Sequence, residues 1–387
     1  MLVPAAVIAV CLAALAARTD FRTAGTAAFA DPGWDRHLYL EMSDGNPLGF
    51  HIAPYCWRVL VPAVVAVSPL SSQPTMLVLT IASLATAALA LHLLVSRWAG
   101  RTAALASVVL FFSMGWGPRY LLSDFWLPDG LVFALVTVAI LLAARGALVP
   151  FAIVLAVGAA TKESCLAVAP LYYTLNAKRP LDARLLGRTA LAVLPAAAVT
   201  LALRLGIEAR NGDLAYIQSL PPVISRFPEL FPRYNYLDLL GEVGHDQRLR
   251  YLGVDTFHAY SWRTFGVIPL LLALASLRSS WRLALRLSPF LVLVYAQTLV
   301  ATDTERLLVL AFPAVLILAA IGMEQVLAMS RATAVAAAAV ALLAFAPNLA
   351  DPGGYVPAGG VQVAAAIAAA LAFPLSRLVP ARRTRAP

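Results

Sequence analysis

The residues best suited to chemistry lie in one polar stretch, residues 31–62, of a strongly apolar chain. It contains the carboxylates of Asp31, Asp35 and Glu41. A Trp-Asp-x-x-x-Tyr motif places Asp35 and Tyr39 on one helix face if the segment is helical. A carboxylate near an apolar boundary is a reasonable general base, because desolvation raises its pKa towards the operating range. We therefore predict a substrate pocket here, with Tyr39 and Glu41 binding substrate. The alternative is that Asp31 and Asp35 only cap a short surface helix.

Arg58 follows in the element Tyr55-Cys56-Trp57-Arg58, directly before the apolar residues 59–62. An arginine flanked by aromatic side chains at the start of an apolar helix extends to the membrane interface. Its planar guanidinium binds phosphate through two parallel hydrogen bonds. We therefore predict that Arg58 binds an anionic group of a substrate. Simple anchoring at the level of the lipid headgroups is the alternative.

Further along the chain, charged residues border apolar runs, where a charge is costly unless it is paired or functional. Lys162 and Glu163 form the tip between two short apolar runs, and they either pair with each other or hold an anionic substrate. Asp303 and Glu305 precede a long apolar run, where acids favour the helix dipole. The dipole does not explain the adjacent Arg306. Substrate binding is predicted for Lys162, Glu163, Asp303 and Arg306.

The loop at residues 115–130 is also polar and contains Arg119, Asp124 and Asp129. Its carboxylates suit either a divalent cation or the hydroxyl groups of a sugar. The alternative for Asp129 is that it simply starts a helix. We predict that Arg119, Asp124 and Asp129 bind substrate. No two histidines have metal-ligand spacing on one helix face, so no metal site is predicted. We expect no certain cofactor, and a divalent cation remains the open alternative.

The rest of the chain must hold these groups in a membrane. It is 61% hydrophobic and 13% charged, with a mean hydropathy of +0.81. Backbone groups in lipid must close their hydrogen bonds within helices, so this composition predicts an all-α, polytopic transmembrane protein with about 12 spans, roughly 10–13. The runs 264–277 and 287–301, for example, are expected as two helices joined by a basic link. The net charge of +9 does not indicate nucleic-acid binding, because the basic residues lie in short links.

We predict a single integral membrane domain over residues 1–387, in which the first apolar run, 2–17, stays in place as a membrane helix. Residues 18–74 are expected to form a first outer loop with interfacial helices, and residues 207–263 a long outer loop. Short links on the opposite side, such as 176–188, are rich in Lys and Arg. This bias favours a cytoplasmic location for the links and both termini. The candidate residues then face the outer side of the plasma membrane.

The order of three motifs resembles polytopic glycosyltransferases of the GT-C superfamily, including mannosyltransferases and bacterial relatives. The Trp-Asp-x-x-x-Tyr motif follows the first helix, an aromatic-Arg-x-Leu-x-Pro element occupies residues 57–62, and Lys-Glu forms an outer hairpin tip. The resemblance implies an inverting transferase that moves a sugar from a polyprenyl-phosphate donor to an acceptor at the outer face. It also implies that Asp35 is the catalytic base. Asp31 remains the alternative base.

The same resemblance implies that Arg58, Lys162 and Arg306 stabilise the departing lipid phosphate. The expected partners are the lipid-linked donor, membrane lipids and a glycan, lipid or protein acceptor. No Walker, GxSxG or HExxH motif occurs, so a nucleotide-driven or serine-hydrolase reaction has no support. Two other classes remain as alternatives. One is a transporter or flippase for a lipid-linked or anionic solute, which predicts charges near the middle of helices. The other is a non-catalytic membrane scaffold.

Overall fold

The computed structural model describes residues 2–30, 35–52, 54–114, 116–179, 181–208, 261–297, 304–327 and 333–350. The regular elements in these ranges are helices, as predicted. The longer ones are α1 (Leu2–Ala16), α4 (Ser72–Val95), α5 (Arg101–Ser113), α7 (Asp129–Ala144), α8 (Leu148–Thr161), α10 (Ala183–Gly206), α14 (Val267–Gln297), α16 (Phe312–Leu327) and α17 (Thr333–Phe345). The shorter ones are η1 (Ala27–Phe29), α2 (Asp35–Asp44), η2 (Pro47–Gly49), η3 (Tyr55–Trp57), α3 (Leu60–Ala66), α6 (Pro118–Ser123), η4 (Glu163–Val168), α9 (Ala169–Asn176), α15 (Thr304–Leu308), η5 (Val309–Ala311) and α18 (Pro347–Ala350).

Four helical segments in the described ranges are long and apolar enough to cross a membrane. They are α4, α10, α14 and Glu305–Gln325, which combines parts of α15, η5 and α16. Five shorter apolar helices accompany them within the same ranges. An apolar helix of about 20 residues matches the thickness of the hydrocarbon core. The helices are therefore compatible with a membrane protein. The apolar run 361–375 and residues 209–260 of the predicted long loop lie outside the described residues.

The predicted division between two helices is present as a kink within α14, and not as a loop. The expected helices at 264–277 and 287–301 meet without a linking loop, and α14 runs through the basic segment with non-helical angles at Ser280 (φ −110°, ψ 20°). The hydroxyl of Ser280 donates to the carbonyl oxygen of Ser276 at 2.8 Å, and such bonds to the preceding turn bend helices. The segment is otherwise rich in Arg and Leu, which favour helix. Two helices therefore meet at a kink at Ser280, and the basic segment that was expected as a link is helical on both sides of it.

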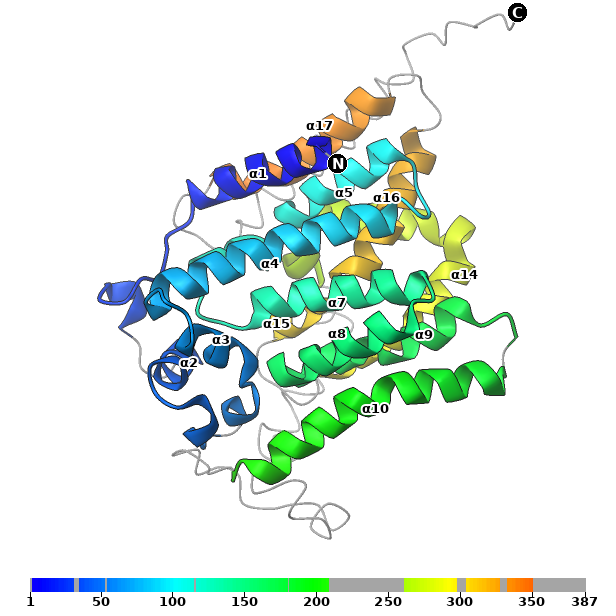
Figure 1. Cartoon of the computed structure of the whole chain (residues 1–387). Helices are drawn as coiled ribbons and strands as arrows, with labels where there is room; N and C mark the ends of the chain where they lie inside the picture. The colour runs from blue at the N-terminus through cyan, green and yellow to red at the C-terminus, as the bar shows by residue number, and fades with distance from the viewer. Residues whose placement is uncertain are drawn as a thin grey trace, which may run out of the picture.

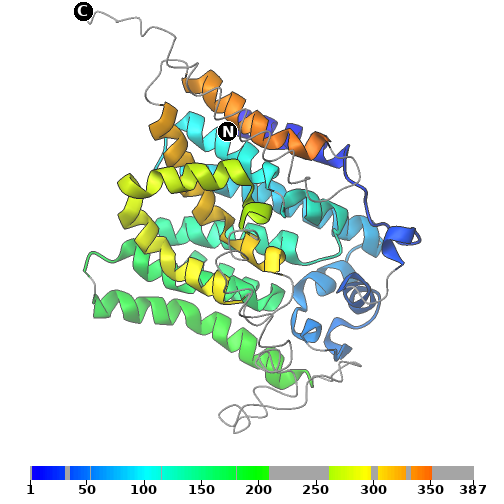
Figure 2. The same ribbon diagram turned by 180° about the vertical axis from the view of Figure 1, so that it is seen from behind.

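The longer helices form one bundle, and the short helices α2 and α3 cover one of its ends (Figure 1). α7 packs against α4 and α8, α8 packs on α10, and α16 packs on α14 and α5. Seen from behind, the bent α14 lies over this bundle (Figure 2). The rings of Phe111, Phe133 and Phe312 meet between α5, α7 and α16, with centroids 4.9 to 6.3 Å apart. This apolar packing fixes the helix ends that carry the polar residues.

Candidate functional site

Most of the predicted site residues gather at the end of the bundle that α2 and α3 cover. Contacts link eight side chains there, which we call the charge cluster: Asp35, Tyr39, Tyr55, Arg58, Asp129, Lys162, Glu163 and Arg306. They come from α2, η3, the first turn of α7, the turn after α8, and α15. All are therefore at helix ends or in short connecting elements.

Asp35 is the first residue of α2 and binds partners from distant parts of the chain. The Tyr55 hydroxyl donates to Oδ1 at 2.6 Å, and Nη1 of Arg306 donates to Oδ2 at 2.7 Å. Burial alone would raise the pKa of Asp35, but the charge of Arg306, these two hydrogen bonds and the charge of Arg58 hold it below its ordinary value. The sequence-based expectation of a raised pKa is therefore wrong here, because nearby cations outweigh desolvation.

Arg306 in α15 links Asp35 to a second carboxylate. Its Nε and Nη2 each lie 3.2 Å from Oδ2 of Asp129. The other oxygen of Asp129 accepts a hydrogen bond from Nζ of Lys162 at 2.7 Å. The Asp129 and Lys162 side chains are almost fully buried, and pairing offsets the cost of burying their charges. Asp129 also starts α7, so it has both a helix-end position and ion-pair partners.

Arg58 forms the other ion pair of the charge cluster. Its Nε and Nη2 donate to the two carboxylate oxygens of Glu163 at 3.2 and 2.7 Å, and Nη1 donates to the Tyr39 hydroxyl at 3.2 Å. Burial alone would raise the pKa of Glu163, but the charge and hydrogen bonds of Arg58 lower it to about 2. Lys162 and Glu163, the two residues of the predicted hairpin tip, thus have partners in different elements. Glu163 binds Arg58, and Lys162 binds Asp129.

Tyr55 is the one residue of the charge cluster that was not predicted as a site residue. In the sequence it is only an aromatic neighbour of Arg58. η3 brings it under the guanidinium of Arg58, whose central carbon is 5.6 Å from the ring centroid. The ring also packs edge-on against Tyr39, with centroids 5.5 Å apart. Helix α2 places Asp35 and Tyr39 one turn apart, and both contact Tyr55. The sequence feature that could have identified Tyr55 is its position three residues before Arg58.

Asp124 belongs to a separate buried group. Its Oδ2 accepts hydrogen bonds from Nη1 of Arg22 at 2.6 Å and from Nη1 of Arg36 at 3.3 Å. Burial raises the pKa of Asp124, although both arginines act in the opposite direction. The Trp126 indole donates to the carbonyl oxygen of Arg22 at 2.6 Å. Because Arg36 follows Asp35 directly, Asp124 fixes the start of α2. Its substrate-binding role stays a prediction.

The other predicted residues lie apart from these contacts or outside the described ranges. Arg119 is fully buried in α6 and donates to the carbonyl oxygens of Asn348 at 3.0 Å and Arg18 at 3.2 Å. It therefore ties α6 to α18 and to the segment after α1. Glu41 lies on the exposed side of α2. The predicted residues outside the described ranges are Asp31 and Asp303.

No protein-family model, curated protein or solved structure matches this chain. The resemblance to GT-C glycosyltransferases therefore rests on the sequence motifs alone. The chemistry of the cluster has to be judged from its own geometry. That geometry combines a carboxylate of lowered pKa, two guanidinium groups and one ammonium group at one end of an apolar helix bundle.

A metal site of three or more His, Cys, Asp or Glu side chains is absent from the described part of the chain. The carboxylates of Asp124 and Asp129, for which the sequence leaves a divalent cation as an alternative, have cationic side chains as partners. Asp124 binds arginine, and Asp129 binds both Arg306 and Lys162. These contacts neutralise the carboxylates without an added cation.

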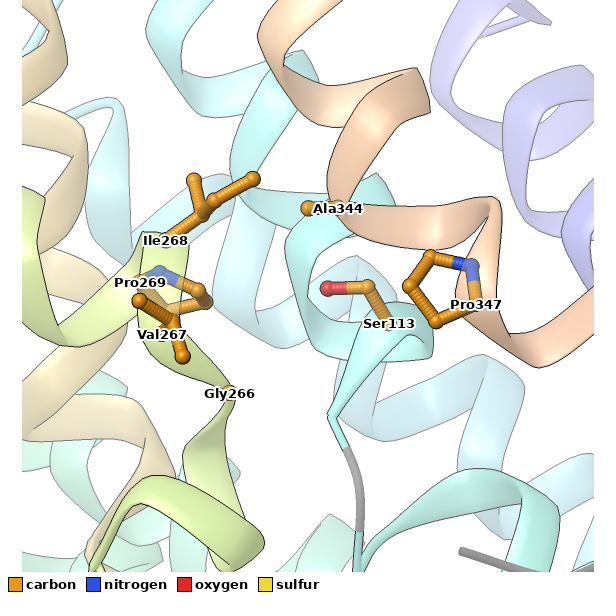
Figure 3. Close-up of a pocket in the computed structure, with 7 residues that line it drawn as sticks. All are labelled: Ser113, Gly266, Val267, Ile268, Pro269, Ala344 and Pro347. Carbon is orange, nitrogen blue, oxygen red and sulfur yellow. The ribbon is translucent and has the colours of Figure 1, made fainter. Parts of the chain in front are cut away.

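Two pockets flank the segment after α5. One adjoins the charge cluster and is lined by Trp116, Gly117, Tyr120, Leu121, Asp129, Phe133, Arg306 and Val309. It therefore combines aromatic and apolar walls with two cluster charges. The other lies between the end of α5, the start of α14 and the end of α17, and is lined by Ser113, Gly266, Val267, Ile268, Pro269, Ala344 and Pro347 (Figure 3). Its walls are mainly apolar, and the Ser113 hydroxyl is bonded to the Leu110 carbonyl oxygen.

Proposed function

We propose that this protein is a membrane glycosyltransferase of the GT-C type, which moves a sugar from a polyprenyl-phosphate donor to an acceptor with inversion. The observation that carries the proposal is the contact between Asp35 and Arg306, in the same cluster as Arg58 and Lys162. A carboxylate base that accepts a proton and cations that stabilise a leaving phosphate are the two requirements of this reaction.

In the proposed reaction, Asp35 takes the proton of an acceptor hydroxyl as the hydroxyl oxygen attacks the anomeric carbon. The new carbon–oxygen bond forms while the bond between the anomeric carbon and the phosphate oxygen breaks, and its electron pair stays on the phosphate. Arg306 and Arg58 stabilise the charge that develops there, and Lys162 adds a third positive charge. Tyr55 orients Asp35 through the hydrogen bond to Oδ1.

The positions of the charges favour this reaction over transport. A transporter places charged side chains near the middle of its helices, where they line a pathway. Here Asp129 starts α7, Lys162 follows α8, and Arg58 lies between η3 and α3. In the proposed membrane setting, a site at the helix ends would lie near the boundary between membrane and water, which suits a lipid-borne donor and a water-borne acceptor.

The proposal includes a setting in the plasma membrane, with about 12 spans. The charge cluster would face the outer side, and both termini the cytoplasm. Basic residues at the opposite end of the bundle support this orientation through the positive-inside bias, for example Arg97, Arg101 and Arg145 near the ends of α4, α5 and α7. The donor would then be a lipid-linked sugar of the cell envelope.

The test is reconstitution of the purified protein in vesicles with radiolabelled polyprenyl-phosphate sugars and a membrane extract that supplies acceptors. The wild-type protein should transfer label, and Asp35→Asn should reduce transfer by about 10²- to 10⁴-fold, the usual contribution of a general base. Asp44→Asn is the matched control, because it makes the same change at the other end of α2. Transfer by Asp35→Asn at the wild-type rate would contradict the assignment. Release of a trapped solute without any transfer would favour a transporter.

A further inference from the structure

Every cation of the charge cluster already contacts a carboxylate, in the pairs Arg58–Glu163, Lys162–Asp129, Arg306–Asp35 and Arg306–Asp129. Three cations thus meet three carboxylates among the described residues, and their charges balance. Adding an anion to a balanced, largely buried group leaves an excess negative charge, which is costly in a low dielectric. An anionic substrate that binds one of these cations is therefore expected to displace a carboxylate from it.

Of the two carboxylates that contact Arg306, Asp35 is the easier one to displace; Glu163, the most exposed carboxylate of the charge cluster at 34%, is held by Arg58. The Asp35 side chain is 22% exposed, compared with 1% for Asp129. Asp35 also lies on α2, a ten-residue helix outside the long helices of the bundle. Arg306 reaches it through Nη1, whereas Arg58 holds both oxygens of Glu163 in the stronger two-bond arrangement.

We propose that the guanidinium of Arg306 is the binding site for the substrate phosphate. Without substrate, the Asp35 carboxylate occupies this site, and the phosphate binds by displacing it. The inference rests on the proposed function, since it concerns the same site and names the group of the donor that enters it. It adds that substrate and catalytic base compete for one cation. Binding of the donor and release of the base then become a single event.

The exchange explains how a carboxylate held by an arginine acts as a base. The charge of Arg306 is the largest influence that lowers the pKa of Asp35 against the effect of burial. When a phosphate takes this charge, desolvation acts on Asp35 with less opposition, and its affinity for a proton rises. Tyr55 still holds Oδ1 and keeps the carboxylate in place. Asp35 therefore becomes a stronger base when the donor is bound.

Apolar side chains lie beside Arg306, together with the carboxylate of Asp129. The pocket that contains Arg306 has walls from Trp116, Tyr120, Phe133 and Val309. Aromatic and aliphatic side chains provide contacts for hydrocarbon but none for a hydrated inorganic anion. The comparison of farnesyl phosphate with inorganic phosphate below tests whether these apolar walls add to the affinity that the cation provides.

Binding of a sugar-free probe tests the exchange without requiring sugar transfer. The full-length protein in detergent micelles would be titrated calorimetrically with farnesyl phosphate, inorganic phosphate and the neutral alcohol farnesol. Asp35→Asn removes the competing carboxylate and should bind farnesyl phosphate about tenfold more tightly than the wild type. Asp35→Ala provides a second variant should the asparagine protein not fold. Asp44→Asn makes the same chemical change on α2 away from Arg306 and should leave the affinity near that of the wild type.

Tighter binding of farnesyl phosphate by the Asp35 variants, with an unchanged affinity for farnesol, supports the exchange. If the affinity for inorganic phosphate also rises, Arg306 binds the phosphate group itself. If only the affinity for farnesyl phosphate rises, a lipid phosphate is required. Equal or weaker binding of farnesyl phosphate by the Asp35 variants overturns the inference, as does an equal gain by Asp44→Asn. A protein that shows the exchange but transfers no sugar keeps this inference and loses the proposed transferase function.

Discussion

Nη1 of Arg306 lies 2.7 Å from Oδ2 of Asp35, although 271 positions separate the two residues in the chain. The carboxylate comes from a short helix near the N-terminus, and the guanidinium comes from α15, beyond most of the bundle. Their contact joins the segment that carries the proposed base to the segment that carries the cation proposed to bind phosphate. It also connects the stability of this end of the bundle to its chemistry.

Loss of the Arg306 charge is expected to destabilise the protein strongly. Arg306→Gln leaves Asp129 buried with Lys162 alone and takes a cation from Asp35, and removal of one partner from a buried ion pair costs about 3 kcal/mol. Arg263→Gln is the matched control, because its side chain is 60% exposed and pairs with Glu305 at 3.3 Å. That change should cost less than about 1 kcal/mol. Unfolding in mixed detergent micelles measures both, and equal losses would contradict the prediction.

Tyr55→Phe is expected to move the acid limb of the rate–pH profile to higher pH. The Tyr55 hydrogen bond stabilises the charged form of Asp35, so its removal raises the pKa of Asp35 and leaves less of the base form at low pH. The nearby charges of Arg306 and Arg58 are unchanged. Tyr172→Phe is the control, since its hydroxyl bonds to the Gly146 carbonyl oxygen. If Tyr55→Phe lowers the amount of folded protein but leaves the acid limb of the rate–pH profile at the same pH, Tyr55 has only a packing role.

Acid is expected to weaken the pair of Arg58 and Glu163. The pKa of Glu163 is about 2 in the folded protein, below the ordinary value of 4.5. A lowered pKa of this kind stabilises the fold above pH 4.5, and that contribution is lost as the pH falls from 4.5 towards 2. Glu163→Gln should be less stable at neutral pH and lose less on acidification.

Unfolding midpoints measured between neutral pH and pH 2 test this prediction, with Glu41→Gln as the control. Glu41 lies on the exposed side of α2, so its replacement should leave the acid sensitivity of the wild type in place. The same acid loss in Glu163→Gln as in the wild type would show that the pair does not contribute.

Cysteine labelling tests the proposed orientation. Leu48, between α2 and η3, is 61% exposed, and Leu181, between α9 and α10, is 90% exposed. The three native cysteines are buried, so background labelling should be low. A membrane-impermeant maleimide should label Leu48→Cys in intact cells and Leu181→Cys only after permeabilisation. The opposite pattern would place the charge cluster on the cytoplasmic side.

Local features of the sequence predicted much of the secondary structure. The apolar residues 75–95 belong to α4 and the apolar residues 148–160 to α8, because apolar composition and length are properties of one segment. The spacing of Asp35 and Tyr39 likewise placed both side chains on one face of α2, as an interval of four residues does in any helix. The two helices of α14 were also predicted, but the kink at Ser280 that joins them was not, since whether a polar segment forms a loop or a kinked helix depends on its neighbours.

The sequence by itself thus determined an apolar helical chain and the segments in which its charged residues are concentrated. Only the tertiary structure decided their partners, since contacts such as Lys162–Asp129, Arg58–Glu163 and Arg306–Asp35 join separate elements. A charge attracts any opposite charge within reach, so residue type alone does not select a partner. The same applies to the pKa of Asp35. Burial raises it and nearby cations lower it, and the balance depends on distances that the packing of the helices sets.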